Sequence, residues 1–323
     1  MSILLLSNTA DDYCTPLVEQ ALRDRGADFF TLHTDLFPAE LQIDANPDGL
    51  SFSDGQRHIH SRELRAVWHR RSVVGGSLPR DMDPAFRGAA ITESQRVFTG
   101  AIAEIDAFHL DPPALSQAAN NKQRQLRLAK QAGLSIPRTC ITNDPEVARR
   151  FILDCPGGAI TKLMTNLTVA LDEHSEGLMF TSAVGPDDLE ALDALQLCPM
   201  TFQERVPKAY ELRITAVGDQ LFAARINSQV EAAASLDWRR KGSDMIAQWQ
   251  HHALPDDIQK RIRMVMQRLG LHYGAFDFIV TPTGDYVFLE VNPWGEWFWK
   301  QEYPGLPIAQ AIAGLLLNPP ERP

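Results

Sequence analysis

The chain has 323 residues, of which 44% are apolar and 22% are charged, proportions typical of globular proteins. They exclude a mainly disordered chain and a collagen-like fibre, and the length is enough for two or three domains. With 31 basic and 41 acidic residues the formal net charge is −10, which argues against a general nucleic-acid binder, because such a protein needs a basic surface.

Residues 1–115 alternate strand and helix patterns. In chain order we expect a buried strand at 3–6, a helix ending near Gly26, a strand at 28–32, a hairpin at 41–52, a strand at 66–68 and a helix at 84–107. Because strands and helices alternate, the pattern favours a small parallel α/β domain.

Residues 116–195 are expected to form a compact α+β lobe. A helix is indicated at 121–132, because Gly133 and Pro137 follow it as termination signals. The other expected elements are a strand at 158–164, candidate partner strands at 167–171 and 178–181, and a short helix at 186–195.

Residues 196–323 are expected to form a second lobe that is rich in strands. Turn residues between apolar strands indicate two hairpins, one at 210–217 with 221–227 and one at 275–280 with 286–291. The other expected elements are a strand at 201–206 and helices at 255–269 and 308–317.

Signals for export and for disulfides are weak. The apolar run at residues 3–6 is too short for a signal peptide, and no stretch approaches the roughly 18 apolar residues of a membrane helix. The four cysteines lie far apart and are expected to be reduced and buried: Cys14, Cys140, Cys155 and Cys198. We therefore expect a cytoplasmic protein without a membrane partner.

Three oxygen-bearing side chains mark the second hairpin: Asp277, Glu290 and Asn292. Residues two apart on a strand share a face, so Glu290 and Asn292 point the same way, and Asp277 lies across the hairpin. Two carboxylates and an amide oxygen are hard ligands that suit Mg²⁺. The alternative is that these are solvent-facing polar residues of an amphipathic hairpin. The intervening apolar residues define its buried face and leave the polar face to be explained: Phe276, Phe278, Leu289 and Val291.

Two lysines are candidates for binding an anion. Lys162 lies within the expected strand at 158–164, where an unpaired buried ammonium is costly, so it needs an anion or an exposed strand face. Lys122 opens the helix at 121–132, where an ordinary surface lysine is the alternative.

The segment 203–207 joins two expected strands and can offer backbone groups to a planar base, with Glu211 placed to accept hydrogen bonds from ribose hydroxyls. Arg213 and Arg225 fall on adjacent strands of the first hairpin, where both can face one phosphate, since arginine suits bidentate phosphate contacts. The alternative is a surface ion pair between Glu211 and Arg225.

The joint order of these residues resembles the ATP-grasp fold, and the resemblance covers the whole chain. It implies an α/β chain with an N-terminal parallel α/β domain at 1–115, a central lobe at 116–195 and a C-terminal lobe at 196–323. The last two would sandwich ATP between them.

The resemblance also assigns roles to single residues. The implied nucleotide-binding residues are Lys122, Lys162, Glu204, Val206 and Glu211, with the backbone of the third and fourth holding adenine and the last contacting ribose. The implied magnesium ligands are Asp277, Glu290 and Asn292. The arginines that would meet the transferred phosphate and the acyl phosphate are Arg213 and Arg225.

Within that superfamily the chain is most similar to the graspetide synthetases, the microviridin-type peptide macrocyclases. The similar segments are residues 34–40, 67–71, 211–215 and 290–297. The last, EVNPWGEW, is the most specific, because general ATP-grasp ligases rarely carry two tryptophans there. One departure is the segment 164–166, which lacks the glycines that many ATP-grasp enzymes use in the loop over the phosphates.

The resemblance implies an ATP- and magnesium-dependent ligase that activates Asp or Glu side chains of a ribosomal precursor peptide as acyl phosphates. A Ser or Thr hydroxyl, or a Lys amine, of the same peptide then closes an ω-ester or ω-amide ring. A homodimer is also implied. The alternatives are a ligase of the glutathione-synthetase or glutamate-ligase type, and a non-catalytic nucleotide- or peptide-binding module.

An acidic enzyme that handles acidic side chains needs local positive charge. Arg70 and Arg71 at a strand end, and Arg239 on an expected loop, are candidates for it, and solvated surface explains each of them equally well. No base for the acceptor is assigned, and the candidates by pKa alone are His69, His251, His252 and His272.

Overall fold

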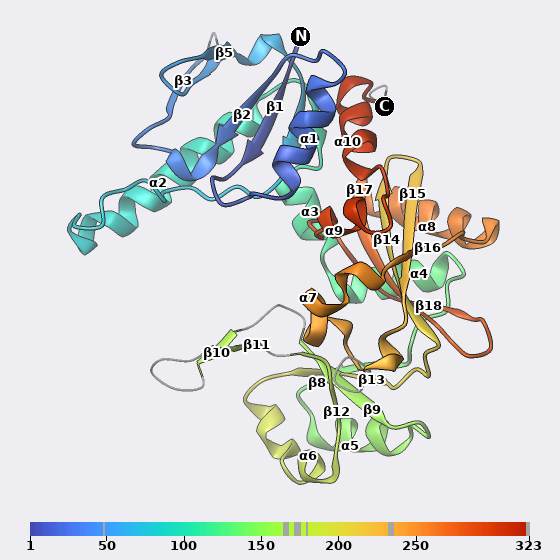
Figure 1. Cartoon of the computed structure of the whole chain (residues 1–323). Helices are drawn as coiled ribbons and strands as arrows, with labels where there is room; N and C mark the ends of the chain where they lie inside the picture. The colour runs from blue at the N-terminus through green and yellow to red at the C-terminus, as the bar shows by residue number, and fades with distance from the viewer. Residues whose placement is uncertain (48, 164–167, 171–175, 179, 232–235, 321–323) are drawn as a thin grey trace.

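The computed structural model describes residues 1–323 except 48, 164–167, 171–175, 179, 232–235 and 321–323. In Figure 1 an N-terminal domain lies at one end, a C-terminal lobe in the middle and a central lobe at the other end. No described helix is long and apolar enough to cross a membrane.

The N-terminal domain has the predicted parallel α/β architecture, built on a four-stranded sheet with the order β2-β1-β6-β7. β1 is buried along its whole length, because α1 and α10 pack on one face of the sheet and α2 packs on the other. A small antiparallel sheet, β3-β4-β5, follows β2. The bounds are β1 Ser2–Ser7, α1 Cys14–Arg23, β2 Phe29–His33, β3 Gln42–Asn46, β4 Gly49–Ser53, β5 His58–His60, β6 Leu64–His69, α2 Pro84–Ala103 and β7 Phe108–Leu110.

The central lobe has an antiparallel sheet with the order β12-β9-β13-β8 and a core of its own. Its elements are β8 Thr139–Thr142, α5 Pro145–Leu153, β9 Ala159–Lys162, β10 Thr168–Ala170, β11 Glu176–Leu178, β12 Ser182–Ala183, α6 Pro186–Glu190 and β13 Met200–Glu204. The predicted partners of β9 are wrong, because β10 and β11 pair with each other while β12 and β13 flank β9. Of the two predicted partner segments, residues 167, 171 and 179 lie outside the described residues.

The C-terminal lobe has a five-stranded antiparallel sheet with the order β16-β15-β14-β17-β18, and both predicted hairpins are confirmed. Its elements are β14 Tyr210–Val217, β15 Gln220–Ile226, α7 Gly242–Met245, β16 Gln250–His251, α8 Asp256–Leu269, β17 Tyr273–Val280, β18 Tyr286–Asn292, α9 Phe298–Glu302 and α10 Ile308–Leu317.

Two helices that precede the central lobe pack on the C-terminal lobe instead. These are α3 (Pro113–Ala119) and α4 (Lys122–Gln131). Residues of both helices share a core with α8, β14, β17 and β18. Conversely, β13 completes the central sheet although it follows residue 195 in the chain. Elements on both sides of residues 115 and 195 therefore pack across the predicted domain boundaries. The boundaries themselves stay predictions.

One hydrophobic core is shared between the N-terminal domain and the C-terminal lobe, whereas the central lobe has a separate core. α10 contributes to one core that contains residues of β1 and β6 together with Val217, Ala224 and Trp297 from the C-terminal lobe. The N-terminal domain and the C-terminal lobe thus share apolar packing, whereas the central lobe buries its own cluster. We conclude that apolar packing fixes the first two relative to each other, while the central lobe depends on other contacts for its position.

Because of a β-bulge, the buried face of the second hairpin differs from the predicted one. The register of β17 and β18 shifts between Asp277 and Phe278, so that Phe288 rather than Leu289 stands opposite Phe278. Phe288 is fully buried and joins the core, and Leu289 is half-buried. The extra residue leaves Glu290 on the same face as Asp277.

This register predicts unequal costs for two neighbouring truncations. We expect Phe288→Ala to lower the free energy of unfolding by about 3–5 kcal/mol, because it removes a fully buried ring. Leu289→Ala should cost clearly less, since this side chain is only partly removed from water. Chemical denaturation followed by circular dichroism measures both losses. Equal losses, or the reverse order, would contradict the bulge.

Candidate active site

The centre of the site is a row of three charged residues across three strands. Arg213 on β14 pairs with Asp277 on β17, and Asp277 pairs with Glu290 on β18. Directly paired residues share a face of the sheet, so the three side chains project together. Nη1 of Arg213 lies 2.6 Å from Oδ2 of Asp277, and the carboxylate side chains are each 24% exposed, which leaves them accessible to a ligand.

The first predicted lysine reaches this row from α4. Nζ of Lys122 lies 3.1 Å from Oε2 of Glu290 and donates to the carbonyl of Val291 at 3.4 Å. The buried side chain of Gln125, one turn later, holds the helix against β18, since its Nε2 donates to the Val291 carbonyl at 2.7 Å and its Oε1 accepts from the Val291 N–H at 3.1 Å. Sequence reasoning missed Gln125, which had no signal beyond its place one turn after Lys122.

The second predicted lysine comes from the central lobe. Lys162 ends β9, and its charge interacts with Glu290, Asp277 and Lys122. Burial lowers the pKa of Lys162, and the nearby Lys122 lowers it further, while Glu290 opposes the change. The central lobe therefore brings its cation to the carboxylates of the C-terminal lobe, as the sequence predicted.

These cations hold Glu290 in its charged form. Burial alone would favour the neutral acid, but Lys122 and Lys162 outweigh it and lower the pKa of Glu290 to about 2. Asn292 continues the same face two residues later, and its Oδ1 accepts from the N–H of Trp294 at 3.0 Å. Two carboxylates and an amide oxygen on one face fit the ligand set of Mg²⁺.

Arg213 sits in a close-fitting cradle. A Cβ added to Gly295 would lie 2.5 Å from Nη2 of Arg213 and 2.4 Å from Cβ of Ala275, so only glycine fits there. Among the described residues, Nε of Arg213 is a buried donor without a hydrogen-bond partner. Beneath it Lys300 is fully buried and donates to Oγ1 of Thr215, and burial lowers its pKa well below the ordinary value.

The predicted partnership of Arg213 with Arg225 is wrong. Arg225 pairs with Leu212, and Arg213 pairs with Ala224, so the two arginines project from opposite faces of the sheet. Arg225 donates to Oε1 of Gln250 and lies over the ring of Tyr210, away from the carboxylates. The sequence showed adjacent strands but not their register, and a shift of one residue reverses the face.

Arg239, predicted only as a possible source of positive charge on a loop, interacts electrostatically with Asp277 and Glu290. It makes a two-pronged pair with Asp237, with Nε and Nη2 each 2.8 Å from a carboxylate oxygen. That hydrogen bond, together with the charges of Asp277 and Glu290, raises the pKa of Arg239. Its side chain is 49% exposed, so it combines a fixed position with access to solvent.

The segment between the lobes carries the remaining predicted nucleotide residues. Oε1 of Glu204 accepts from the Arg138 N–H at 2.9 Å, and Val206 is half-buried after the end of β13. Glu211 opens β14, with its side chain only 12% exposed, and burial raises its pKa although Lys208 and Ser228 bind the carboxylate. Lys208, at 3.0 Å from Oε1 of Glu211, is a contact that the sequence did not suggest.

The two arginines at the end of β6 have different surroundings. Arg70 is buried, pairing with Asp11 at 3.1 Å and with Glu296, so the prediction that it offers charge to a substrate is wrong. Arg71 is half-exposed and lies 2.5 Å from Oε1 of Glu296. The sequence could not separate these neighbours, because only the tertiary contacts decide which one is covered.

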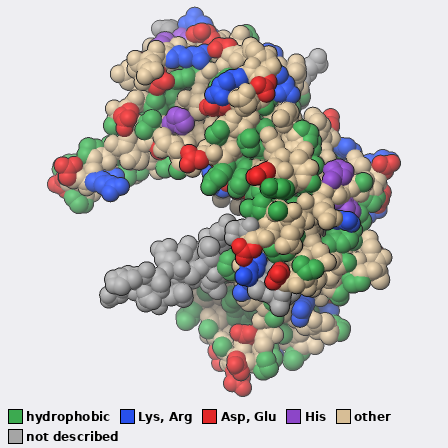
Figure 2. All heavy atoms as spheres, in the orientation of Figure 1, with side chains coloured by type: hydrophobic (Ala, Val, Ile, Leu, Met, Phe, Trp, Pro, Cys, Tyr) green, Lys and Arg blue, Asp and Glu red, His purple; other side chains and the backbone are tan. Residues whose placement is uncertain are grey.

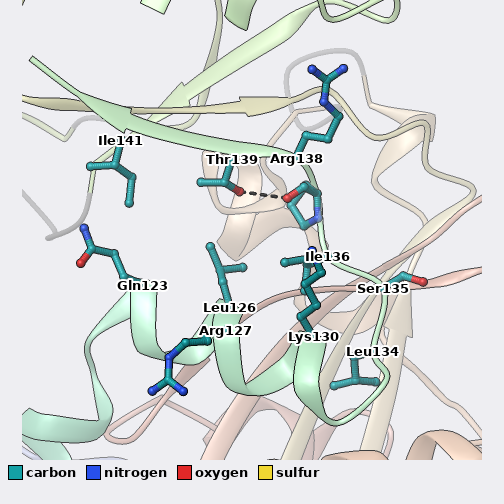
Figure 3. Close-up of a pocket in the computed structure, with 11 residues that line it drawn as sticks. Gln123, Leu126, Arg127, Lys130, Leu134, Ser135, Ile136, Arg138, Thr139 and Ile141 are labelled. Atoms are coloured by element: carbon teal, nitrogen blue, oxygen red, sulfur yellow. Dashed lines mark hydrogen bonds between the residues drawn. The ribbon is translucent and has the colours of Figure 1, made fainter. Parts of the chain in front are cut away.

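A cavity of about 620 Å³ lies between α4 and β8, away from the charged row (Figure 3). Leu126 and Ile136 line it together with Thr139, whose Oγ1 donates to the Pro137 carbonyl at 2.9 Å. None of the predicted site residues is among those that line it. Separately, the space-filling view shows the molecule hollowed on one side, between the N-terminal domain and the lower half (Figure 2).

Two lobes that converge on paired carboxylates, two lysines and an arginine, next to a parallel α/β domain, define the class as an ATP-grasp fold. The comparisons with known proteins agree. A family model described as the MvdD pre-ATP grasp domain matches residues 2–117. No curated protein matches the chain.

Solved structures extend the similarity over the whole chain. The macrocyclase MdnC from Microcystis aeruginosa MRC, bound with precursor peptide MdnA, is 42% identical, with a TM-score of 0.88 over 98% of this chain and 100% of that one. The RiPP-associated ATP-grasp ligase of Chryseobacterium gregarium, in complex with ADP and a leader and core peptide, is 33% identical, with a TM-score of 0.94 over 99% and 98%. Macrocyclase MdnB from Microcystis aeruginosa MRC is 38% identical, with a TM-score of 0.79 over 98% and 99%.

The chain therefore belongs to the family of RiPP-associated ATP-grasp macrocyclases. This confirms the resemblance and the fold inferred from the sequence.

The ion pair of Lys122 predicts how acid affects stability. The folded-state pKa of Glu290, about 2, lies below its ordinary 4.5, so its charge stabilises the fold above pH 4.5 and that contribution is lost as the pH falls toward 2. Lys122→Met should raise this pKa and so reduce the stability lost across that window. Unfolding free energies measured at several acidic pH values test this. Lys130→Met, on the exposed side of α4, is the control, and identical profiles for both variants would contradict the pairing.

Proposed function

We propose that the protein is an ATP-dependent ligase that forms intramolecular crosslinks in a ribosomal precursor peptide. An Asp or Glu side chain is activated as an acyl phosphate, and a Ser or Thr hydroxyl or a Lys amine of the same peptide displaces the phosphate. The single observation that carries the proposal is the row of Arg213, Asp277 and Glu290, faced by Lys122 and Lys162, in a chain of this family.

The cofactors proposed are ATP and magnesium. Asp277, Glu290 and Asn292 would hold the metal, which supplies charge neutralisation at the phosphates when bound. Lys122 and Lys162 bind the anionic nucleotide, and they are already placed around a carboxylate, so a phosphate oxygen finds two cations in position.

The segment between the lobes is proposed to hold the nucleoside. Backbone groups of Glu204 and Val206 would face the adenine ring, and Val206 is half-buried just after β13. Glu211 accepts hydrogen bonds from the ribose hydroxyls, since Lys208 and Ser228 already fix the position of its carboxylate.

The chemistry of the two steps needs charge screening and positioning rather than a covalent protein intermediate. In the first step the peptide carboxylate oxygen attacks the γ-phosphorus, and ADP leaves. In the second the hydroxyl or amine attacks the acyl carbon, loses its proton, and phosphate leaves, so each ring costs one water in the peptide's mass. Arg213 and Arg239 are the arginines that we propose to screen the transferred phosphoryl group, with Arg239 replacing Arg225 in this role.

Replacing Glu290 tests this proposal. We expect Glu290→Gln to reduce product formation by at least about a hundredfold, because a metal ligand and a charge are lost together. The assay is mass spectrometry of the precursor encoded beside the enzyme's gene, incubated with enzyme, ATP and magnesium, in which each ring removes one water.

The control for this variant is Glu302→Gln, an exposed carboxylate at the end of α9, which should behave as the wild type. Circular dichroism checks that both variants fold. Retained ring formation in Glu290→Gln would contradict the metal assignment. Amino-acid-stimulated ATP hydrolysis without any response to the peptide would favour a small-molecule ligase instead.

We further propose that the protein acts in the cytoplasm, where ATP and ribosomal peptides are available, and that it is a homodimer. The N-terminal half of α2 projects from the body of the molecule in Figure 1, and Phe86 on it is 66% exposed. An exposed aromatic side chain on a projecting helix suits a contact with a second copy.

The dimer proposal predicts a mass of twice 36.0 kDa in light scattering. Phe86→Glu should shift the protein toward the monomer, because it places a charge in the contact. Leu197→Glu, at a 90% exposed position on the central lobe, is the matched control and should leave the mass unchanged. A wild-type monomer at micromolar concentration would contradict the proposal.

A further inference from the structure

The topology of the N-terminal sheet places side by side two loops that the proposed chemistry does not use. In the order β2-β1-β6-β7, the chain leaves β1 for β2 on one side and later returns to β6 on the other. In α/β folds, ligands commonly bind at the carboxyl ends of the two strands between which the direction of winding reverses in this way. The loops concerned are residues 8–13 and 70–77, and Nδ2 of Asn8 ties them together by donating to the Arg71 carbonyl at 2.8 Å.

A stacked aromatic pair, with one exposed and one half-buried ring, lies at the end of the first loop. Tyr13 ends the first loop with 60% of its surface exposed, and its ring stacks on Phe298 with centroids 4.5 Å apart and planes 20° apart. Phe298 begins α9 and packs partly against the core shared by the N-terminal domain and the C-terminal lobe. Phe298 therefore holds the Tyr13 ring in place, while much of the Tyr13 side chain stays accessible to solvent.

An exposed cation stands beside it. Arg71 opens the second loop with 52% of its side chain exposed, and its Nη2 lies 2.5 Å from Oε1 of Glu296. The other oxygen of Glu296 is engaged by the buried Arg70 and by the Cys14 thiol, which lies next to Tyr13 in the chain. Glu296 thus fixes Arg71 in place and still leaves part of its guanidinium open to solvent.

The aromatic pair and the cation are continuous with the metal-ligand turn. The N–H of Gly295 donates to the Asn292 carbonyl at 3.2 Å, and Nη1 of Arg70 donates to the Trp294 carbonyl at 3.5 Å. Glu296 lies four positions after Asn292, the last proposed metal ligand, and Phe298 lies six positions after it. Gly295 lies against Arg213, because a Cβ there would be 2.5 Å from Nη2 of Arg213, and the next residue, Glu296, pairs with Arg71. This surface therefore adjoins the arginine end of the charged row.

We propose that Tyr13, Phe298 and Arg71 form a subsite for the core segment of the precursor peptide, next to the carboxylate that is being activated. Arg71 binds a second acidic side chain of the core, and the Tyr13 ring packs on an apolar or proline side chain. The occupant follows from charge and position, because an exposed arginine beside a carboxylate-activating site suits a peptide with several acidic residues. This inference rests on the proposed function and names a determinant of its substrate choice.

Two variants test the subsite by direct binding. With the fluorescently labelled precursor encoded beside the gene, we expect Tyr13→Ala and Arg71→Ala each to weaken peptide binding by about fivefold to tenfold, as for loss of one charge-assisted or aromatic contact. The KM for ATP should stay within twofold of the wild-type value. Leu153→Ala, on a 69% exposed side chain of the central lobe, and Arg23→Ala, on a half-exposed arginine of α1, are the controls.

A charge reversal separates recognition from a structural role. The Arg71→Glu variant should bind the natural core peptide more weakly than the wild type does. For a core peptide whose non-reacting acidic residues are replaced by Lys, the order should reverse, and the variant should bind more tightly than the wild type. A structural role for Arg71 would not produce this exchange of preference. Unchanged peptide affinity in both alanine variants would overturn the subsite. Absence of ring formation by the wild type would instead contradict the proposed function, and the binding measurements would still decide the subsite.

Discussion

The site depends on one constraint, the register of β14, β17 and β18. That register sets Arg213, Asp277 and Glu290 side by side, so that one cation and two carboxylates form a row across three strands. A slip of one residue in this register would turn the charged side chains into the apolar core and expose the phenylalanines on the opposite face. Burial of those phenylalanines therefore opposes the slip. The hydrophobic face of the sheet therefore specifies the position of the charges on the other face.

Charge balance then links the lobes. Glu290 stays ionised in a largely covered position because Lys122 comes from α4 and Lys162 comes from the central lobe. Removing either cation leaves a carboxylate whose burial opposes its charge. Since the central lobe has its own apolar core, the attraction between Lys162 and this carboxylate is one of the forces that holds it over the site. A nucleotide's phosphates would take over the same cations, which connects binding to the position of the lobe.

The other side of the molecule is organised by packing rather than by charge. α10 and Trp297 fill a core that includes strands of the N-terminal sheet and of the C-terminal lobe, so these two parts form one support. Arg70, buried with Asp11 and Glu296, crosses the same boundary with ion pairs. The loops after β1 and β6 consequently have a fixed position relative to the turn at residues 292–296.

Sequence reasoning succeeded where a local pattern carries the information. Alternation of apolar residues and turn signals gave both hairpins of the C-terminal lobe, and the motif at 290–297 led to the family. It failed where contacts between distant segments decide the outcome. β9 pairs with β12 and β13 rather than with the nearest apolar segments, and Arg70 is buried while Arg71 is not.

By itself, then, the sequence determined the kind of fold and predicted that Asp277, Glu290 and Asn292 share one face of the second hairpin, because strand periodicity and residue type depend only on near neighbours in the chain. Tertiary structure alone decided that Arg225 faces away, that Arg239 approaches the carboxylates, and that Gln125 and Gly295 support the site. These outcomes follow from the register between strands and from the close approach of side chains more than a hundred residues apart in some cases, and neither leaves a trace in local composition.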